Sequence, residues 1–342
     1  MKILITGGCG FVGSNIAIFL KKRLKRSKIY SLDNLMRKGS NLNMKRLSFN
    51  KIKNFKIDIT NYFKISKLEK FDLIIDCCAE PAIEASKKDP DRVFNTNLVG
   101  TFNILKKCIK DKSNLIFLSS SRVYSIKHLR NLIKKTNINK PIKISKKIDE
   151  NFETSMASSL YGFTKLASEK LIKEFFFKTK LKYIINRFGV IAGPWQFGKQ
   201  DQGFVPLWVA KHFLKKRLNY IGFGGYGEQV RDVIHIDDVS EIILSQIKKI
   251  GKNFNLTFNI GGGMKNSISL KSLTKKCEIL TNNKIKIGRK PKTSIYDIPY
   301  YVTNNYKITR LYNWKPKKNI NQILNDILNW LYKNKNVRNF FQ

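Results

Sequence analysis

Two residues spaced four apart, Tyr161 and Lys165, are types that can do proton chemistry together. Residues at this spacing lie on one face of a helix. An ammonium group near a phenol favours the phenolate and lowers the pKa of the phenol, so the tyrosine could act as a general base near neutral pH. The same pair also occurs on exposed helix faces without any chemical role. The interpretation therefore depends on what the rest of the chain places beside the pair.

A row of three hydroxyl groups, Ser119 to Ser121, precedes this pair in the chain. The row follows an apolar run at 114–118, which predicts a buried strand. Serines at a strand end are also ordinary turn residues. Here a helix predicted from Tyr161 to about Lys178 follows them, and this order favours a site that combines the hydroxyls with the tyrosine and the lysine.

The amino-terminal stretch supplies an element that can position a cofactor. Residues 2–6 are an apolar run, glycines follow at 7, 10 and 13, and a helical pattern comes next. Glycines permit a tight turn and a close approach of backbone N–H groups to a pyrophosphate, which the helix N-terminus also favours. A second apolar run, 29–32, ends in Asp33, twenty positions after Gly13. A carboxylate there can accept hydrogen bonds from an adenosine ribose, so the sequence predicts a dinucleotide-binding unit.

The same stretch has a second interpretation, because residues 3–20 carry no charge and are long enough for a signal peptide or a membrane span. Four glycines and an asparagine interrupt it, and no small-residue cleavage site precedes the basic run 21–28. The five cysteines are odd in number and lack a C-x-x-C pair, so neither a disulfide framework nor a zinc site is predicted. We therefore expect a cytoplasmic protein with no membrane partner and no metal.

The charge of the chain is strongly positive, with 66 Lys and Arg against 24 Asp and Glu, a formal net charge of +42. Such a charge would ordinarily indicate binding to nucleic acid or to an anionic membrane. The lysines are scattered along the whole chain, however, and no nucleic-acid-binding motif accompanies them. We expect no dedicated nucleic-acid partner, although this field would attract a doubly charged nucleotide substrate.

Further strand ends are predicted to line the cofactor crevice of a parallel sheet. Apolar runs at 55–57 and 71–75 each end in an aspartate, and the carboxyl ends of parallel strands meet at one edge. Arg37, in the loop after Asp33, could instead bind a 2′-phosphate. Because Asp33 would repel that phosphate, NAD is favoured over NADP.

Taken in order, these motifs resemble the extended short-chain dehydrogenase/reductase family, in its branch of nucleotide-sugar epimerases and dehydratases. The matching segments span nearly the whole chain, at 6–13, 33–34, 58–59, 97–101, 161–165, 231–238 and 258–262. The resemblance implies an α/β fold with a Rossmann-type doubly wound parallel sheet in residues 1–185, to which segments near 230–262 return. Residues 186–342 would form a smaller α/β substrate lobe. It further implies bound NAD, a nucleotide-sugar substrate and a homodimer built on the helices near 93–109 and 161–178.

The resemblance also assigns roles to individual residues. Counting back from Val123 and Tyr124, Ser120 falls on the catalytic serine or threonine position, beside Tyr161 and Lys165. The implied substrate contacts are Ser121, Arg187, Gln202 and Arg231. The implied cofactor contacts are Gly7, Gly10, Phe11, Val12, Gly13, Asp33, Asn34, Arg37, Asp58, Ile59, Cys78, Ala79, Glu80, Asn97, Tyr161 and Lys165.

A narrower likeness, carried by residues 33–39, 196–203 and 229–233, is to the branch that inverts C2 of CDP-linked dideoxyhexoses. Ser121 and Arg122 replace the Asp–Glu pair with which dehydratases eliminate water, so dehydration lacks its proton carriers. Val190 replaces an asparagine of the 4-epimerases and weakens that alternative without removing it. A protein that binds NAD without catalysis is a further alternative, against which the intact Ser120, Tyr161 and Lys165 set speaks.

Two other segments carry expectations. Ser294 stands where the family often has an arginine, so Arg289 or Lys292 would have to supply one diphosphate contact. The basic insertion 125–150 could be a flap over the sugar, but a solvated loop is favoured. Residues from 307 onward, with an amphipathic helix at about 320–333, are expected to have a structural role.

Overall fold

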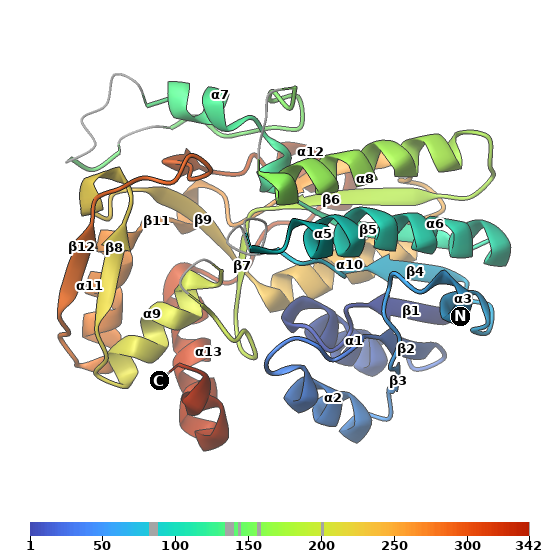
Figure 1. Cartoon of the computed structure of the whole chain (residues 1–342), viewed down its shortest axis with the longest axis horizontal. Helices are drawn as coiled ribbons and strands as arrows, with labels where there is room; N and C mark the ends of the chain where they lie inside the picture. The colour runs from blue at the N-terminus through green and yellow to red at the C-terminus, as the bar shows by residue number, and fades with distance from the viewer. Residues whose placement is uncertain (82–87, 134–139, 143–144, 156–158, 200–201, 342) are drawn as a thin grey trace.

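The computed structural model describes residues 1–81, 88–133, 140–142, 145–155, 159–199 and 202–341, and Figure 1 shows two lobes. Seven parallel strands form the sheet of the first lobe in the order β10-β6-β5-β4-β1-β2-β3. The order runs outward from the middle in both directions, so the sheet is doubly wound. The strands are β1 (Lys2–Thr6), β2 (Lys28–Leu32), β3 (Lys53–Phe55), β4 (Leu73–Asp76), β5 (Asn114–Ser120), β6 (Tyr183–Phe188) and β10 (Leu256–Ile260).

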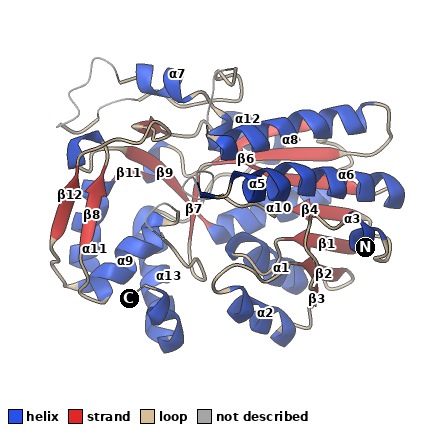
Figure 2. Ribbon diagram, viewed as in Figure 1, coloured by secondary structure: helices blue, strands red, loops and turns tan. Residues whose placement is uncertain are grey.

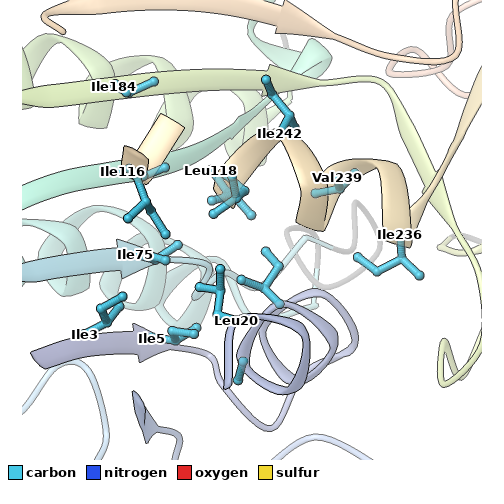
Figure 3. Packing of buried hydrophobic residues seen from close by; sticks show 14 of the residues in the cluster. Ile3, Ile5, Leu20, Ile75, Ile116, Leu118, Ile184, Ile236, Val239 and Ile242 are labelled. Atoms are coloured by element: carbon cyan, nitrogen blue, oxygen red, sulfur yellow. The ribbon is translucent and has the colours of Figure 1, made fainter. Parts of the chain in front are cut away.

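Helices cover both faces of this sheet, which explains why its strands are nearly continuous apolar runs. One face packs on α1 (Phe11–Arg23), α10 (Ile236–Lys249) and α12 (Tyr306–Tyr312), and the other on α3 (Tyr62–Ser66), α6 (Gly100–Asp111) and α8 (Leu160–Phe177). Figure 3 shows Ile3 and Ile5 of β1 facing the same core as Leu20 of α1 and Ile242 of α10, all of them fully buried. This confirms the expected Rossmann-type fold.

The second lobe combines short strands with helices, as Figure 2 shows by colour. Its central strand β9 (Val230–His235) pairs with β7 (Val190–Ala192), β11 (Ser267–Ser269) and β13 (Tyr300–Tyr301), while β8 (Leu218–Ile221) pairs with β12 (Ile287–Lys290). The helices are α9 (Phe204–Phe213), α11 (Leu270–Thr281) and α13 (Ile320–Lys333). The predicted amphipathic helix is confirmed as α13, which a capping box of Asn319 and Gln322 begins.

The boundaries differ from the sequence prediction in three places. The limit expected at 185 falls inside β6, so the chain crosses to the second lobe only after Phe188. The third strand ends at Phe55 instead of extending to 57, because its partner β2 ends at Leu32 and the chain then turns. The helix predicted near 93–109 comprises α5 (Pro90–Phe94), a π-helical turn (Asn95–Val99) and α6.

The insertion 125–150 is only in part the solvated loop that was predicted, since 140–141 and 145–147 are exposed and irregular but other described residues are packed. Residues 126–131 form α7 (Ile126–Asn131), whose Ile126 and Leu129 are buried together with Ile148, Ile298 and Tyr301. The backbone of Ile148 also bonds to Val302 and Asn304 of the second lobe. Apolar side chains at these positions therefore attach the insertion to residues 298–304.

Candidate active site

A cavity of about 1090 Å³ lies along the carboxyl ends of the first-lobe strands and extends to residues of the second lobe. Among the predicted cofactor contacts, those that line it are Gly7, Gly10, Phe11, Val12, Gly13, Asp33, Asn34, Arg37, Asp58, Ile59, Cys78, Ala79, Glu80 and Tyr161. From the second lobe it takes residues of β8 and β9 and of the segment 294–297. This is the edge at which doubly wound sheets bind their ligands.

The glycine turn between β1 and α1 forms a cradle that side chains would fill. A Cβ atom at Gly13 would lie 2.3 Å from the carbonyl oxygen of Gly7, and Gly7 itself has φ +59°. The Gly10 amide bonds to the Gly7 carbonyl at 2.9 Å, which closes the turn. No side chain caps the start of α1, which is fully described, and its first turn holds no acidic residue. The positive end of the helix is thus available to a pyrophosphate.

Asp33, at the end of β2, fixes this turn and also faces the cavity. Its Oδ2 accepts a hydrogen bond from the Cys9 amide at 3.0 Å, and its Oδ1 accepts one from the Leu35 amide at 2.8 Å. Burial raises the pKa of this carboxyl, against the amide bonds that lower it. A carboxylate has about four lone-pair sites, so acceptor capacity remains for a ribose hydroxyl.

Two predicted cofactor contacts, Asn97 and Lys165, are not among the residues that line the cavity. Asn97 is fully buried, where its Oδ1 accepts the Glu80 amide at 2.7 Å and its Nδ2 donates to Thr164 at 3.2 Å. It therefore holds the cavity wall at Glu80 against α8. Lys165 is 1% exposed, and its Nζ lies 3.9 Å from the centre of the Phe117 ring. Burial lowers the pKa of Lys165, and the nearby Asp76 raises it.

Tyr161 and Ser120 meet at the cavity. Tyr161 lies in the first turn of α8, which Ser159 caps by accepting the Gly162 amide at 3.2 Å. It lines the cavity together with Ser120, the last residue of β5. Burial raises the pKa of Tyr161, while Ser120 and the charges of Arg122 and Arg37 lower it. The net direction is upward, opposite to the one predicted from the Tyr–Lys spacing, because burial of the phenol outweighs its neighbours.

The four predicted substrate contacts separate into two groups. Ser121, Gln202 and Arg231 line the cavity, and Arg37 donates a hydrogen bond to Gln202 from the opposite lobe. Arg187 is not among the lining residues. Its Nη2 and Nε both bond to Glu169 of α8, at 2.7 Å and 3.0 Å, and both side chains are buried. Burial would lower the pKa of Arg187, but the hydrogen bonds and charge of Glu169 raise it.

Sequence reasoning assigned no site role to several residues that line the cavity. The sequence marked Arg122 only as a departure from the dehydratases and gave no role to Asp297, yet both residues line the cavity. Arg231 Nη2 lies 3.3 Å from Asp297 Oδ1. Burial lowers the pKa of Arg231 to about 10, an effect that Asp297 opposes. Arg289 and Lys292, the proposed replacements at the diphosphate, are exposed and do not line the cavity.

A glycine cradle, an acidic strand end, Tyr161 and Ser120 face one cavity on a doubly wound sheet. This combination defines a nicotinamide-dependent enzyme, since the cradle suits a dinucleotide and the tyrosine can move a proton next to it. Within the described chain, no helix is long and apolar enough to cross a membrane, and no three His, Cys, Asp or Glu side chains gather as metal ligands.

Comparisons with known proteins agree with this class. Residues 3–261 match the model of the NAD dependent epimerase/dehydratase family. CDP-paratose 2-epimerase of Salmonella typhi is 30% identical over 96% of this chain and 99% of that protein, and UDP-glucuronate 4-epimerase of Thermodesulfobacterium geofontis is 26% identical over 97% and 96%. The solved structure of UDP-glucose 4-epimerase from Thermotoga maritima, 23% identical, has a TM-score of 0.81 over 97% of this chain and 99% of that one. The chain belongs to the NAD-dependent epimerase/dehydratase family, and NAD is its cofactor.

Proposed function

We propose that this protein is an NAD-dependent nucleotide-sugar epimerase that inverts C2 of a CDP-linked 3,6-dideoxyhexose, the activity of a CDP-paratose 2-epimerase. The observation that carries the proposal is that Ser120 and Tyr161 line the same cavity as the glycine cradle. Ser121 and Arg122 stand where a dehydratase would need an acid and a base, which disfavours water elimination. The whole-length similarity to CDP-paratose 2-epimerase supports the choice of substrate.

The residues of this chain divide the proton work between them. NAD, when bound, supplies a reversible acceptor for a hydride. Tyr161 takes the proton of the sugar hydroxyl while the carbon that bears this hydroxyl gives up its hydride. Ser120 holds the phenol in place. The keto-sugar then turns, and the carbon regains its hydride on the opposite face while Tyr161 returns the proton. The sugar thus regains both the proton and the hydride that it lost, so the reaction consumes no external reductant.

The substrate is held by polar groups from both lobes. Arg231 offers a guanidinium to the diphosphate, and Ser121 and Gln202 offer smaller polar groups along the same cavity. Such contacts persist from ground state to transition state and therefore act mainly on affinity. The net charge of +42 favours the encounter with a doubly negative substrate.

The proposal is tested with purified protein and a panel of CDP- and UDP-sugars followed by NMR. We expect NAD, and little NADP, to be released on denaturation, because the hydride stays bound between the two half-reactions and Asp33 disfavours a 2′-phosphate. A CDP-paratose substrate carrying deuterium at C2 should give a product that retains the label. Complete exchange of the label with water would indicate proton abstraction and would contradict the mechanism. Turnover of UDP-glucose alone would favour the 4-epimerase alternative.

We also propose a homodimer in the cytoplasm. Five large apolar side chains stand exposed on the helices α5, α6 and α8, with fractions of 38–79%: Phe94, Phe102, Ile109, Phe163 and Phe177. Apolar groups gathered on packed neighbouring helices favour pairing with a second copy. The five cysteines are free thiols, which suits a reducing compartment. Light scattering that shows only monomer at micromolar concentration would contradict the dimer.

A further inference from the structure

We infer that Arg122 is a positioning residue of the reaction: the second lobe holds its guanidinium in the cavity that contains Tyr161, where its charge stabilises the tyrosinate. This inference deepens the proposed function and rests on it for the identity of the reaction. It assigns to Arg122 the electrostatic task that the sequence pattern assigned to Lys165.

The first support is the place of Arg122 in the chain. It lies in the 3₁₀ turn Ser121–Val123, which directly follows β5, and it lines the cavity together with Ser120 and Tyr161. Its backbone amide donates to the Ser120 hydroxyl oxygen at 3.2 Å. The end of β5 and the turn that follows it thus bring the Ser120 hydroxyl and the Arg122 side chain to the cavity that Tyr161 lines.

The second support is the anchor of the side chain. Arg122 Nη1 donates to the Tyr296 carbonyl at 3.0 Å, and Tyr296 belongs to the second-lobe segment that also contributes Asp297 to the cavity wall. A guanidinium has five N–H donors in one rigid plane, so an anchor at one nitrogen orients the whole charged group. The contact crosses from the first lobe to the second and sets the direction of the side chain.

The third support is the distribution of charge around Tyr161. Burial raises the pKa of the Tyr161 phenol, and the cations that oppose this include Arg122, from the turn after β5, and Arg37, from the loop after β2. Lys165 lies one turn further along α8, behind the cavity lining and against Phe117. On the α5 side, Arg92 is paired with Glu80 at 2.7 Å, so these two charges largely offset each other. Burial lowers the pKa of Arg122, an effect that the charges of Asp297 and Tyr161 oppose.

The test compares Arg122→Met and Arg122→Lys with the control Arg130→Met. Arg130 Nη2 donates to the carbonyls of Ser294 and Asp297 at 2.8 Å and 2.9 Å, so it anchors the same segment, but it does not line the cavity. The titration of Tyr161 is read as phenolate absorbance, by subtracting the spectrum of the same protein carrying Tyr161→Phe. This readout needs no substrate.

We expect Arg122→Met to raise the titration midpoint of Tyr161 by about one pH unit or more, the usual effect of losing a nearby opposite charge. Arg122→Lys should recover most of the shift and also covers the case in which the methionine variant does not fold. Arg130→Met should leave the midpoint unchanged. An unchanged midpoint in Arg122→Met, or an equal shift in Arg130→Met, would overturn the inference.

Activity gives a second readout. In the profile of kcat against pH, the acidic limb should move to higher pH in Arg122→Met. It should stay in place in Arg130→Met. A rise in KM with an unmoved pH profile would instead make Arg122 a substrate contact and overturn the inference. If the wild-type protein turns over no nucleotide sugar, the proposed function fails, and the spectroscopic titration still decides the role of Arg122.

Discussion

Arg187 and Arg231, two arginines with the same expected role as substrate contacts, pair with carboxylates in different surroundings in the structure. Arg187 and Glu169 form several hydrogen bonds, and their side chains are only 7% and 1% exposed. Arg231 and Asp297 make one contact of 3.3 Å, with 11% and 28% exposure, on the wall of the cavity. The first pair is internally satisfied and holds α8 to β6, whereas the second keeps donors and acceptors for a ligand. Burial together with unused hydrogen-bonding capacity therefore distinguishes a site arginine from a structural one.

The largest effect is expected from Arg187→Met. It leaves Glu169 as a buried, unpaired charge, which should lower the free energy of unfolding by about 3–5 kcal/mol in urea denaturation. The double variant Arg187→Met/Glu169→Leu removes both charges and should recover most of this loss. A single variant as stable as wild type, with a raised KM, would make Arg187 a substrate contact and reverse the comparison.

Tyr161→Phe should lower kcat by a factor on the order of 10² or more, because the general base is lost while the ring still packs. NAD binding and the free energy of unfolding should change little. Tyr124→Phe is the matched control, since its buried hydroxyl bonds to Arg187 and Asn259 and is absent from the cavity lining. That variant should lose stability and keep kcat. Equal losses of kcat in both variants would contradict a catalytic role that is specific to Tyr161.

Arg231→Ala should raise KM by about tenfold or more and leave kcat nearly unchanged, because a charged hydrogen bond contributes about 1.5–3 kcal/mol and persists through the reaction. Initial rates over a range of nucleotide-sugar concentrations measure both constants. A loss confined to kcat would show that the guanidinium acts only on the transition state.

The smallest effect concerns a buried group outside both pairs, His235. Burial lowers its pKa to about 4, and its Nδ1 accepts the Asp237 amide at 3.0 Å at the start of α10. Between about pH 6.5 and pH 4, His235 is therefore protonated in the unfolded chain and neutral in the folded chain. This contribution to stability is complete above pH 6.5 and is lost as the pH falls. His235→Asn keeps a capping side chain but removes the titrating group. Urea denaturation should therefore show a smaller decrease in the free energy of unfolding from pH 7 to pH 5 in this variant than in wild type.

The sequence was sufficient for features that depend on local spacing. The glycine turn, Asp33, the tyrosine helix and the amphipathic helix at Ile320–Lys333 follow from periodicity and residue type. Features that depend on the partner of a side chain were beyond it. Arg187 and Glu169 are eighteen positions apart on different elements, and nothing in their spacing indicates that they pair. Arg122 was visible only as a departure from a motif, because its anchor at Tyr296 lies 174 residues away.

The sheet order has a consequence for how the chain acquires its structure during synthesis. The edge strand β10 and the helix α10, which covers α1, come more than two hundred residues after β1. A ribosome adds about 5–20 residues per second. The apolar side of β1 and α1 is therefore synthesised roughly ten seconds or longer before the helix α10 that packs on it. The glycine turn, the first part of the site to be made, is therefore among the last to be enclosed.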